Sequence, residues 1–176
     1  MTTFEFTIIA TGLDPEANNF ESRFYDGACN DASVSFQKGH ILLDFARDAD
    51  SLEQAISTAV LDAQEAGATV ERIEPDPLVS LADIASRADM SRGAMTNYVQ
   101  GLRQVGFPPP RLRVTTKSPM WDWADVAIWL YQKERVAREV ALHAVIVSAA
   151  NGALECGGDF AVDLHARVEA RKAELA

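Results

Sequence analysis

The segment Ser80–Gly101, SLADIASRADMSRGAMTNYVQG, decides how this chain is organised. Two serines, Ser80 and Ser91, each precede a run of residues with helical apolar spacing, and a serine hydroxyl in that place can accept a hydrogen bond from a free backbone N–H of the helix. Between the two runs, Asp89 can adopt the left-handed backbone conformation that a tight turn requires. The pattern therefore predicts two short helices joined by a short turn, the second helix covering Arg92–Gly101.

The second predicted helix has an apolar side and a polar side. Met95, Tyr98 and Val99 are expected to face the core, which leaves the polar side chains pointing outward. Arginine can read guanine, and asparagine or glutamine can read adenine, in the major groove of DNA, while a glycine lets the backbone approach the sugar-phosphate edge closely. A short helix with such a polar side has the geometry that groove reading needs. The candidate DNA-contacting residues in and before this helix are Ser91, Arg92, Gly93, Thr96, Asn97 and Gln100.

Several segments, taken in order, resemble one family of DNA-binding proteins. Leu78–Ala85, Met90–Arg92, Gly106–Val114 and Trp121–Leu130 look like the helix-turn-helix regulators of the excisionase-like and AlpA type, which are relatives of the MerR winged helix. In that family a Gly-Phe-Pro element leads into a β-hairpin wing, and the second strand of the wing enters a helix with an acid-valine-x-x-tryptophan pattern. The resemblance is confined to the central segment, and it implies a winged helix-turn-helix over residues 78–132.

The remaining candidates for DNA contact are basic residues that follow the second helix. Basic side chains there can contact phosphates, although the wing tip, Thr115–Pro119, is less basic than in many of the proteins that the segment resembles. The three tryptophans Trp121, Trp123 and Trp129 are expected in the core and not as stacking platforms for single-stranded bases. The basic candidates are Arg103, Arg111, Arg113 and Lys117.

Charge is distributed unevenly along the chain, whose formal net charge is −10. Residues 1–77 have a net charge of −11, residues 78–121 of +4, and residues 122–176 of −3. Because phosphate contacts need lysine and arginine, an acidic chain argues against nucleic-acid binding at first sight. The cationic middle segment nevertheless allows docking on DNA, while the acidic parts suppress non-specific binding elsewhere.

The first 76 residues have the patterns of a small α+β domain. Apolar and polar residues alternate in several segments, which predicts strands. Lys38-Gly39 suits a hairpin turn, and Ser51 with Gln54 suits a capped helix. The order β-α-β-β-α-β is that of ferredoxin-like folds. The expected strands cover residues 4–10, 32–37, 40–46 and 68–73, and the expected helices cover residues 16–26 and 51–66.

The end of the chain is expected to form a C-terminal helical segment over residues 133–176. Arg135–Leu154 is rich in alanine and valine with helical spacing, Gly157-Gly158 breaks it, and Asp159 can cap a last helix. The sequence therefore predicts an α+β protein in three parts: a ferredoxin-like domain over residues 1–76 for dimerisation, partner binding or ligand binding, the winged helix-turn-helix, and these C-terminal helices.

No pattern in the chain indicates an enzyme, a cofactor or a metal site. The sequence has no glycine-rich phosphate loop and no nucleophile signature, and its histidines share no metal-ligand spacing. Cys29 and Cys156 could form a disulfide, but two buried reduced thiols in a cytosolic protein are the favoured interpretation. Without a long apolar run or a secretory signal, we expect a cytoplasmic protein of bacterial type that does not span a membrane.

These patterns favour a transcriptional regulator that binds double-stranded DNA sequence-specifically, with the helix over residues 92–101 in the major groove. Useful specificity normally takes two half-sites, so a homodimer is expected. One alternative is an antitoxin or accessory component of a two-protein system, in which the acidic N-terminal part masks a basic partner. Another is a protein-binding adaptor whose helix-turn-helix no longer touches DNA.

Overall fold

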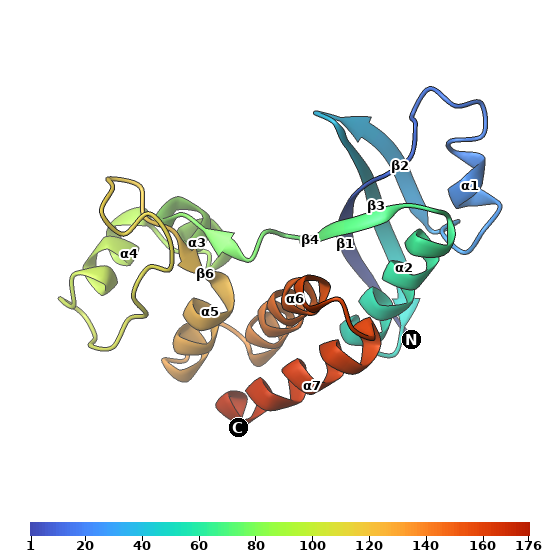
Figure 1. Cartoon of the computed structure of the whole chain (residues 1–176). Coiled ribbons are helices and arrows are strands. Elements are labelled where there is room, and N and C mark those ends of the chain that lie inside the picture. Colours follow the sequence, from blue (N-terminus) through green and yellow to red (C-terminus); the bar gives the residue numbers. More distant parts are fainter. The chain divides into compact units, whose positions relative to one another are not determined.

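The computed structural model describes all 176 residues and has an α+β architecture (Figure 1). The chain divides into two compact units. The first unit contains Met1–Pro75 and Ala149–Val168, and the second contains Asp76–Ser148 and Glu169–Ala176. Each of the two C-terminal helices therefore contributes residues to both units.

A four-stranded antiparallel sheet forms the centre of the first unit, with the strand order β2-β3-β1-β4. One long helix, α2, packs on the sheet (Figure 1). The four strands are those that the alternation predicts, with shifted ends. They are β1 (Thr2–Thr11), β2 (Ala32–Gln37), β3 (His40–Ala49) and β4 (Thr69–Glu74), and the helices of this part are α1 (Ser22–Tyr25) and α2 (Leu52–Glu65).

Alternate residues of the central strands build the core of the first unit. Phe6 of β1 lies opposite Phe45 of β3, and their stacked rings have centroids 5.4 Å apart. The next pair along the strands on this side, Ile8 and Leu43, is completely buried. Full burial of one such side chain stabilises the fold by about 1.5–3 kcal/mol. The helix α2 adds the apolar stripe that its spacing predicts, consisting of Leu52, Ala55, Ile56, Ala59, Val60 and Ala63.

The turns and caps of the first unit follow from local chemistry. Lys38 and Gly39 both have positive φ, 52° and 82°, which is the backbone of a two-residue hairpin turn. The Ser51 hydroxyl accepts a hydrogen bond from the backbone N–H of Gln54 at 3.1 Å, so the predicted cap of α2 is confirmed. The Gln54 side chain accepts from the N–H of Asp50, one residue before the position that a regular capping box uses.

The first helix is much shorter than predicted. The spacing of Phe20 and Phe24 predicts a helix over residues 16–26, but only Ser22–Tyr25 is helical. The side chain of Asp14 accepts the backbone N–H of Glu16, and the N–H of Ala17 bonds to the carbonyl of Asp14. Such local bonds compete with helix formation, so the chain makes turns before α1. The two phenylalanines are still buried, with ring centroids 5.7 Å apart.

One charged side chain, Arg47 of β3, is buried in the first unit. Its guanidinium bonds to both carboxylate oxygens of Asp31, at 2.7 and 2.9 Å, and to Asp62 of α2 at 2.7 Å. It also donates to the carbonyl of Ala28 and the hydroxyl of Thr58. A buried cation needs this degree of pairing, because an unpaired one would be strongly destabilising.

The second unit contains short strands and several helices. Its two-stranded sheet pairs Leu78 with Asp122 and Val79 with Trp121. The elements are β5 (Leu78–Val79), α3 (Leu81–Arg87), α4 (Arg92–Val99), β6 (Trp121–Asp122) and α5 (Trp123–Gln132), together with residues of α6 (Arg138–Cys156), α7 (Phe160–Lys172) and the 3-10 turn η1 (Ala173–Leu175).

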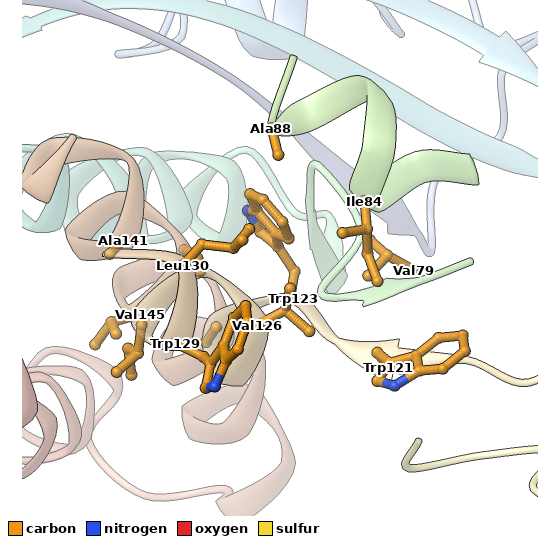
Figure 2. Close-up of a cluster of buried hydrophobic side chains, with 14 of the residues drawn as sticks. Val79, Ile84, Ala88, Trp121, Trp123, Val126, Trp129, Leu130, Ala141 and Val145 are labelled. Atoms are coloured by element: carbon orange, nitrogen blue, oxygen red, sulfur yellow. The ribbon is translucent and has the colours of Figure 1, made fainter. Parts of the chain in front are cut away.

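The three tryptophans lie in the core of the second unit (Figure 2), which confirms their expected place. Trp121, Trp123 and Trp129 are 3%, 7% and 6% exposed. Around them lie apolar residues from four helices and β5, including Val79, Ile84, Val126, Leu130, Ala141 and Val145. Leu175, near the end of the chain, is 1% exposed and belongs to the same core.

Both cysteines are free thiols, but their surroundings differ. Cys29 is buried, and burial, with the nearby carboxylate of Asp62 as a smaller cause, raises the pKa of its thiol to about 11. Cys156 is exposed, so the expectation of a second buried thiol is wrong. It lies at the last residue of α6, directly before Gly157, where a helix end faces solvent.

No helix combines the length and the apolar character that a membrane span requires.

Candidate nucleic-acid interface

The helix pair α3 and α4 begins with the cap that the sequence predicts. The Ser80 hydroxyl accepts from the backbone N–H of Asp83 at 3.2 Å, and the Asp83 carboxylate accepts from the N–H of Ser80 at 2.8 Å. The hydroxyl also donates to that carboxylate at 2.6 Å. This last bond is the main cause that lowers the pKa of Asp83. The two residues therefore form a complete capping box, which fixes the start of α3.

A left-handed turn joins the two helices, as predicted. Asp89 has a φ of 51°, and the N–H of Met90 bonds back to the carbonyl of Ala85 at 2.9 Å. The Ser91 hydroxyl then accepts from the N–H of Ala94 at 3.1 Å and caps α4. The cap, turn and second cap are therefore set by residues that are adjacent in the chain.

One side of α4 is buried and the other is accessible. Met95 and Tyr98 are buried, whereas Arg92, Gly93 and Gln100 are exposed and Thr96 and Asn97 are half-buried. Six of the predicted site residues therefore lie together on or directly before one short helix: Ser91, Arg92, Gly93, Thr96, Asn97 and Gln100.

Val99 is the exception to the predicted apolar side of α4, because it is 42% exposed. Seven residues correspond to about two helical turns, so Val99 shares the exposed side of α4 with Arg92. The helix also ends at Val99, with Gln100 as its C-cap, and does not continue to Gly101. The prediction that Val99 faces the core is wrong for this geometric reason.

The polar side chains of α4 differ in how free they are to bind a ligand. The Thr96 hydroxyl donates to the carbonyl of Arg92 at 2.9 Å, and the Ser91 hydroxyl is occupied by its cap. The side chains of Arg92, Asn97 and Gln100 form no hydrogen bond within the chain. These three side chains therefore have all their donors available for another molecule.

A loop replaces most of the hairpin that the resemblance implies. We call residues 111–120 the wing loop. A single antiparallel bridge between Leu112 and Met120 closes it, and the N–H of Thr116 bonds to the carbonyl of Arg113 inside it. Pro119 has no N–H to give to a longer ladder, and Arg113 has a φ of 54°, so regular strands cannot extend through the loop.

The segment just before the wing loop and the helix α4 pack on the same tryptophan. Phe107 meets the rings of Trp129 and Trp121 edge-on, with centroids 5.1 and 6.4 Å apart. The indole N–H of Trp121 donates to the carbonyl of Pro108 at 3.1 Å. On α4, the ring of Tyr98 lies edge-on to Trp129 at 5.2 Å. Packing on Trp129 therefore fixes both parts of the candidate interface.

The basic candidates outside α4 fall into two groups. Arg103, Arg113 and Lys117 are exposed and form no salt bridge. Arg111, in contrast, has its Nε 3.4 Å from a carboxylate oxygen of Asp125 and its Nη2 3.8 Å from one of Asp122. Three of the four cations are thus free for phosphates, and Arg111 already has acidic neighbours.

The acidic neighbours of Arg111 are functional candidates that sequence reasoning missed. Asp122 caps α5 by accepting from the N–H of Ala124 at 2.8 Å. Burial raises the pKa of Asp122, and the charge of Asp125 raises it further. Asp125 also accepts from Arg171, which is 46 residues away in the chain. The position of Asp122 before a helix is a signal for a cap, but no local signal pairs these residues with Arg111.

Two other kinds of site, a metal site and a ligand pocket, can be compared with this surface. No group of three or more histidine, cysteine or acidic side chains comes together where it could hold a metal ion. An open hollow of about 340 Å³ lies on the sheet of the first unit, where Glu5, Thr7 and Asp44 line it together with Phe6, Phe45 and Ala46. Thr7 donates to Asp44 at 2.6 Å across this surface.

Comparison with known proteins gives no further guide. No protein-family model, no curated protein and no solved structure matches this chain.

Proposed function

We propose that this protein binds double-stranded DNA sequence-specifically and regulates transcription, with α4 lying in the major groove. The observation that carries the proposal is the accessible side of α4, where Arg92, Asn97 and Gln100 have free donors. Met95 and Tyr98, on the other side, hold the helix on its core. A short helix whose apolar side is packed on the core and whose polar side is exposed has the arrangement that reads base edges.

The finer structural assignments belong to the same proposal. We interpret residues 78–132 as a winged helix-turn-helix of the excisionase-like and AlpA type, with a wing reduced to the wing loop. The strand order β2-β3-β1-β4 supports a ferredoxin-like first unit whose first helix is reduced to one turn. One helix reads few base pairs, so two copies on two half-sites are expected.

The first test is selection of binding sites from a random duplex library at near-physiological salt. The proposal predicts one enriched sequence, with a repeated half-site if the protein acts as a dimer. Absence of any enriched sequence would favour the protein-binding adaptor instead.

Substitutions on α4 test the assigned surface. Arg92→Ala and Asn97→Ala should each weaken binding to the selected site by about 1–3 kcal/mol, because each removes a base contact. Arg135→Ala is the matched control, since Arg135 is exposed and lies outside the candidate interface. Gel-shift titration over a range of salt measures the affinities. Wild-type affinity that does not depend on salt would contradict the proposal, because phosphate contacts release counterions.

A second candidate function is favoured by the acidic surface of the first unit. Glu5, Asp44 and Asp48 are exposed on the same side of β1 and β3, opposite the buried phenylalanines. We propose, as this alternative, an antitoxin or accessory role in which the surface binds a basic protein partner. Co-purification of a basic polypeptide from the native host, lost in the variant Glu5→Gln/Asp44→Asn/Asp48→Asn, would support it. A strictly homo-oligomeric native complex would contradict it.

A further inference from the structure

The guanidinium of Arg111 stands beside two carboxylates at the base of the wing loop. Its Nε is 3.4 Å from Asp125 and its Nη2 is 3.8 Å from Asp122. The Arg111 side chain is 60% exposed, whereas Asp122 and Asp125 are 15% and 29% exposed. A phosphate can therefore reach the arginine from solvent, whereas both carboxylates are largely buried beside the arginine.

The carboxylate of Asp125 is held in place by the C-terminal segment. Asp125 accepts from Nη2 of Arg171 at 2.8 Å, and Nε of Arg171 bonds to Glu174 at 3.0 Å. Arg138 donates to the carbonyl of Leu175 at 3.4 Å, and the Leu175 side chain is buried in the core of the second unit. Arg171 therefore neutralises part of the charge of Asp125, and Asp122 has only Arg111 as a cationic neighbour among these groups.

Two anionic groups next to one arginine oppose the approach of a third. At equal distance, like charges repel as strongly as opposite charges attract, and solvent screens both effects at an exposed side chain. The raised pKa of Asp122, caused by burial and then by Asp125, is consistent with two acidic groups crowded together. A DNA phosphate near Arg111 would meet both its attraction and the repulsion of its neighbours.

We propose that Arg111 is a masked phosphate ligand, for which Asp122 and Asp125 compete with DNA. Asp125 is then a positioning residue of the DNA interface, and Arg171 limits how strongly Asp125 holds Arg111. This inference rests on the proposed DNA-binding function. It differs from the simple expectation that all basic residues of the wing loop contact phosphates alike, because Arg113 and Lys117 have no such competitors.

The number of phosphate contacts can be counted from the salt dependence of binding. Affinity falls as salt rises, and each contact adds about 0.9 to the magnitude of the slope of log affinity against log salt. We call this magnitude the slope. Asp125→Asn removes the nearer competitor, so it should increase the slope by up to about 0.9, which corresponds to up to about 3.5-fold more loss of affinity between about 50 and about 200 mM salt. Arg171→Gln should give no increase, because Asp125 then has Arg111 as its main partner.

The experiment measures fluorescence anisotropy of one defined mixed-sequence duplex with the full-length protein. Phosphate contacts do not depend on sequence, so the duplex need not be the natural site. The set contains the wild type, Asp125→Asn, Arg111→Gln, the double variant of these two, and Arg171→Gln. Glu139→Gln serves as a control that removes a carboxylate from α6. The double variant should return to the wild-type slope. Arg111→Gln alone should leave the slope unchanged, as should Glu139→Gln.

The outcomes separate this inference from the proposed function. If the wild type binds DNA and Asp125→Asn does not increase the slope, or if Arg111→Gln alone lowers the slope, the mask does not exist while DNA binding stands. If the wild type does not bind the duplex at any salt concentration, the masked arginine and the proposed DNA-binding function are both rejected. Loss of affinity at every salt without a change of slope would indicate a merely structural role for Asp125. Should Asp125→Asn fail to fold, Asp122→Asn gives the same test, because asparagine keeps the cap of α5.

Discussion

At the scale of single residues, the hydroxyl of Tyr98 is an unusual feature of the second unit. Tyr98 is 1% exposed, and its hydroxyl has no hydrogen-bond partner. A buried polar group without a partner costs about 1–3 kcal/mol. The ring itself is well packed, edge-on to Trp129. The hydroxyl therefore opposes folding while the ring supports it.

Tyr98→Phe should stabilise the protein by about 1 kcal/mol, because it removes the unpaired hydroxyl and keeps the ring. Chemical denaturation of the full chain measures the change. Tyr98→Ala is the control and should destabilise by about 3–5 kcal/mol through the lost packing. A clear loss of stability in Tyr98→Phe would show that the hydroxyl has a partner in solution and would overturn this account.

Single residues also show which parts of the site the sequence can predict. Ser80, Asp89 and Ser91 act through neighbours within a few positions, so their roles follow from residue type and order. Val99 is predicted on the wrong side of α4 although its spacing of seven residues from Arg92, about two turns, already puts it on the polar side. The pairing of Arg111 with Asp125 depends on the fold of the whole unit, and no local pattern contains it.

At the scale of elements, the start of α3 is stabilised by a charge. The Asp83 carboxylate bonds to the hydroxyl and the N–H of Ser80, and these bonds lower the pKa of Asp83. An acid with a depressed pKa in the folded state adds stability at pH values above its unfolded pKa, about 3.9. That contribution is lost as the pH falls through the lower, folded value.

Asp83→Asn should therefore lower the stability of the protein at neutral pH and have little effect at strongly acidic pH. The measurement is the free energy of unfolding of both proteins from pH 7 downward, and the difference between them should shrink below about pH 3.9. Glu155→Gln, at an exposed position without a bonded partner, is the control. A difference that stays constant with pH would mean that the charge of Asp83 does not matter to α3.

Elements also differ in how well the sequence predicts them. The strands and α2 have long periodic patterns and were placed correctly apart from their ends. The helix over residues 16–26 shrank to one turn because the residues before Ser22 form turns, held by bonds to Asp14 and Ala17. The hairpin wing shrank to one bridge because Pro119 and the left-handed Arg113 interrupt it. The first error arises where local hydrogen bonding competes with a periodic pattern, and the second where two residues that cannot continue a ladder interrupt a hairpin that the resemblance implies.

At the scale of the whole molecule, the C-terminal helices do not form a separate body. The sequence shows a helical segment over residues 133–176, but α6 and α7 each contribute to both compact units. The end of α7 and the turn after it place Leu175 in the core of the second unit. Periodicity reveals that a helix is amphipathic and not which partner covers it, so this distribution could not be predicted from the sequence.

In the first unit, α6 protects an edge of the sheet. Strand β4 is the outer strand beside β1. The N–H of Ile73 donates to the side chain of Asn151 at 3.0 Å, and the Asn151 amide donates to the carbonyl of Ile73 at 2.9 Å. One asparagine thus pairs both backbone groups of a buried strand residue, as a neighbouring strand would. Unpaired edges of this kind are sites of association between sheets.

Asn151→Ala should destabilise the protein by about 1–3 kcal/mol, because it leaves two buried backbone groups of Ile73 without this partner. Hydrogen exchange at the Ile73 amide should accelerate more than at the neighbouring amides, and the protein should self-associate at high concentration. Glu155→Ala, on the same helix but exposed, should change none of these three properties. If Asn151→Ala kept the slow exchange of Ile73 and stayed as stable as the wild type, the edge would have another protector, and α6 would be held on the sheet by its apolar residues alone.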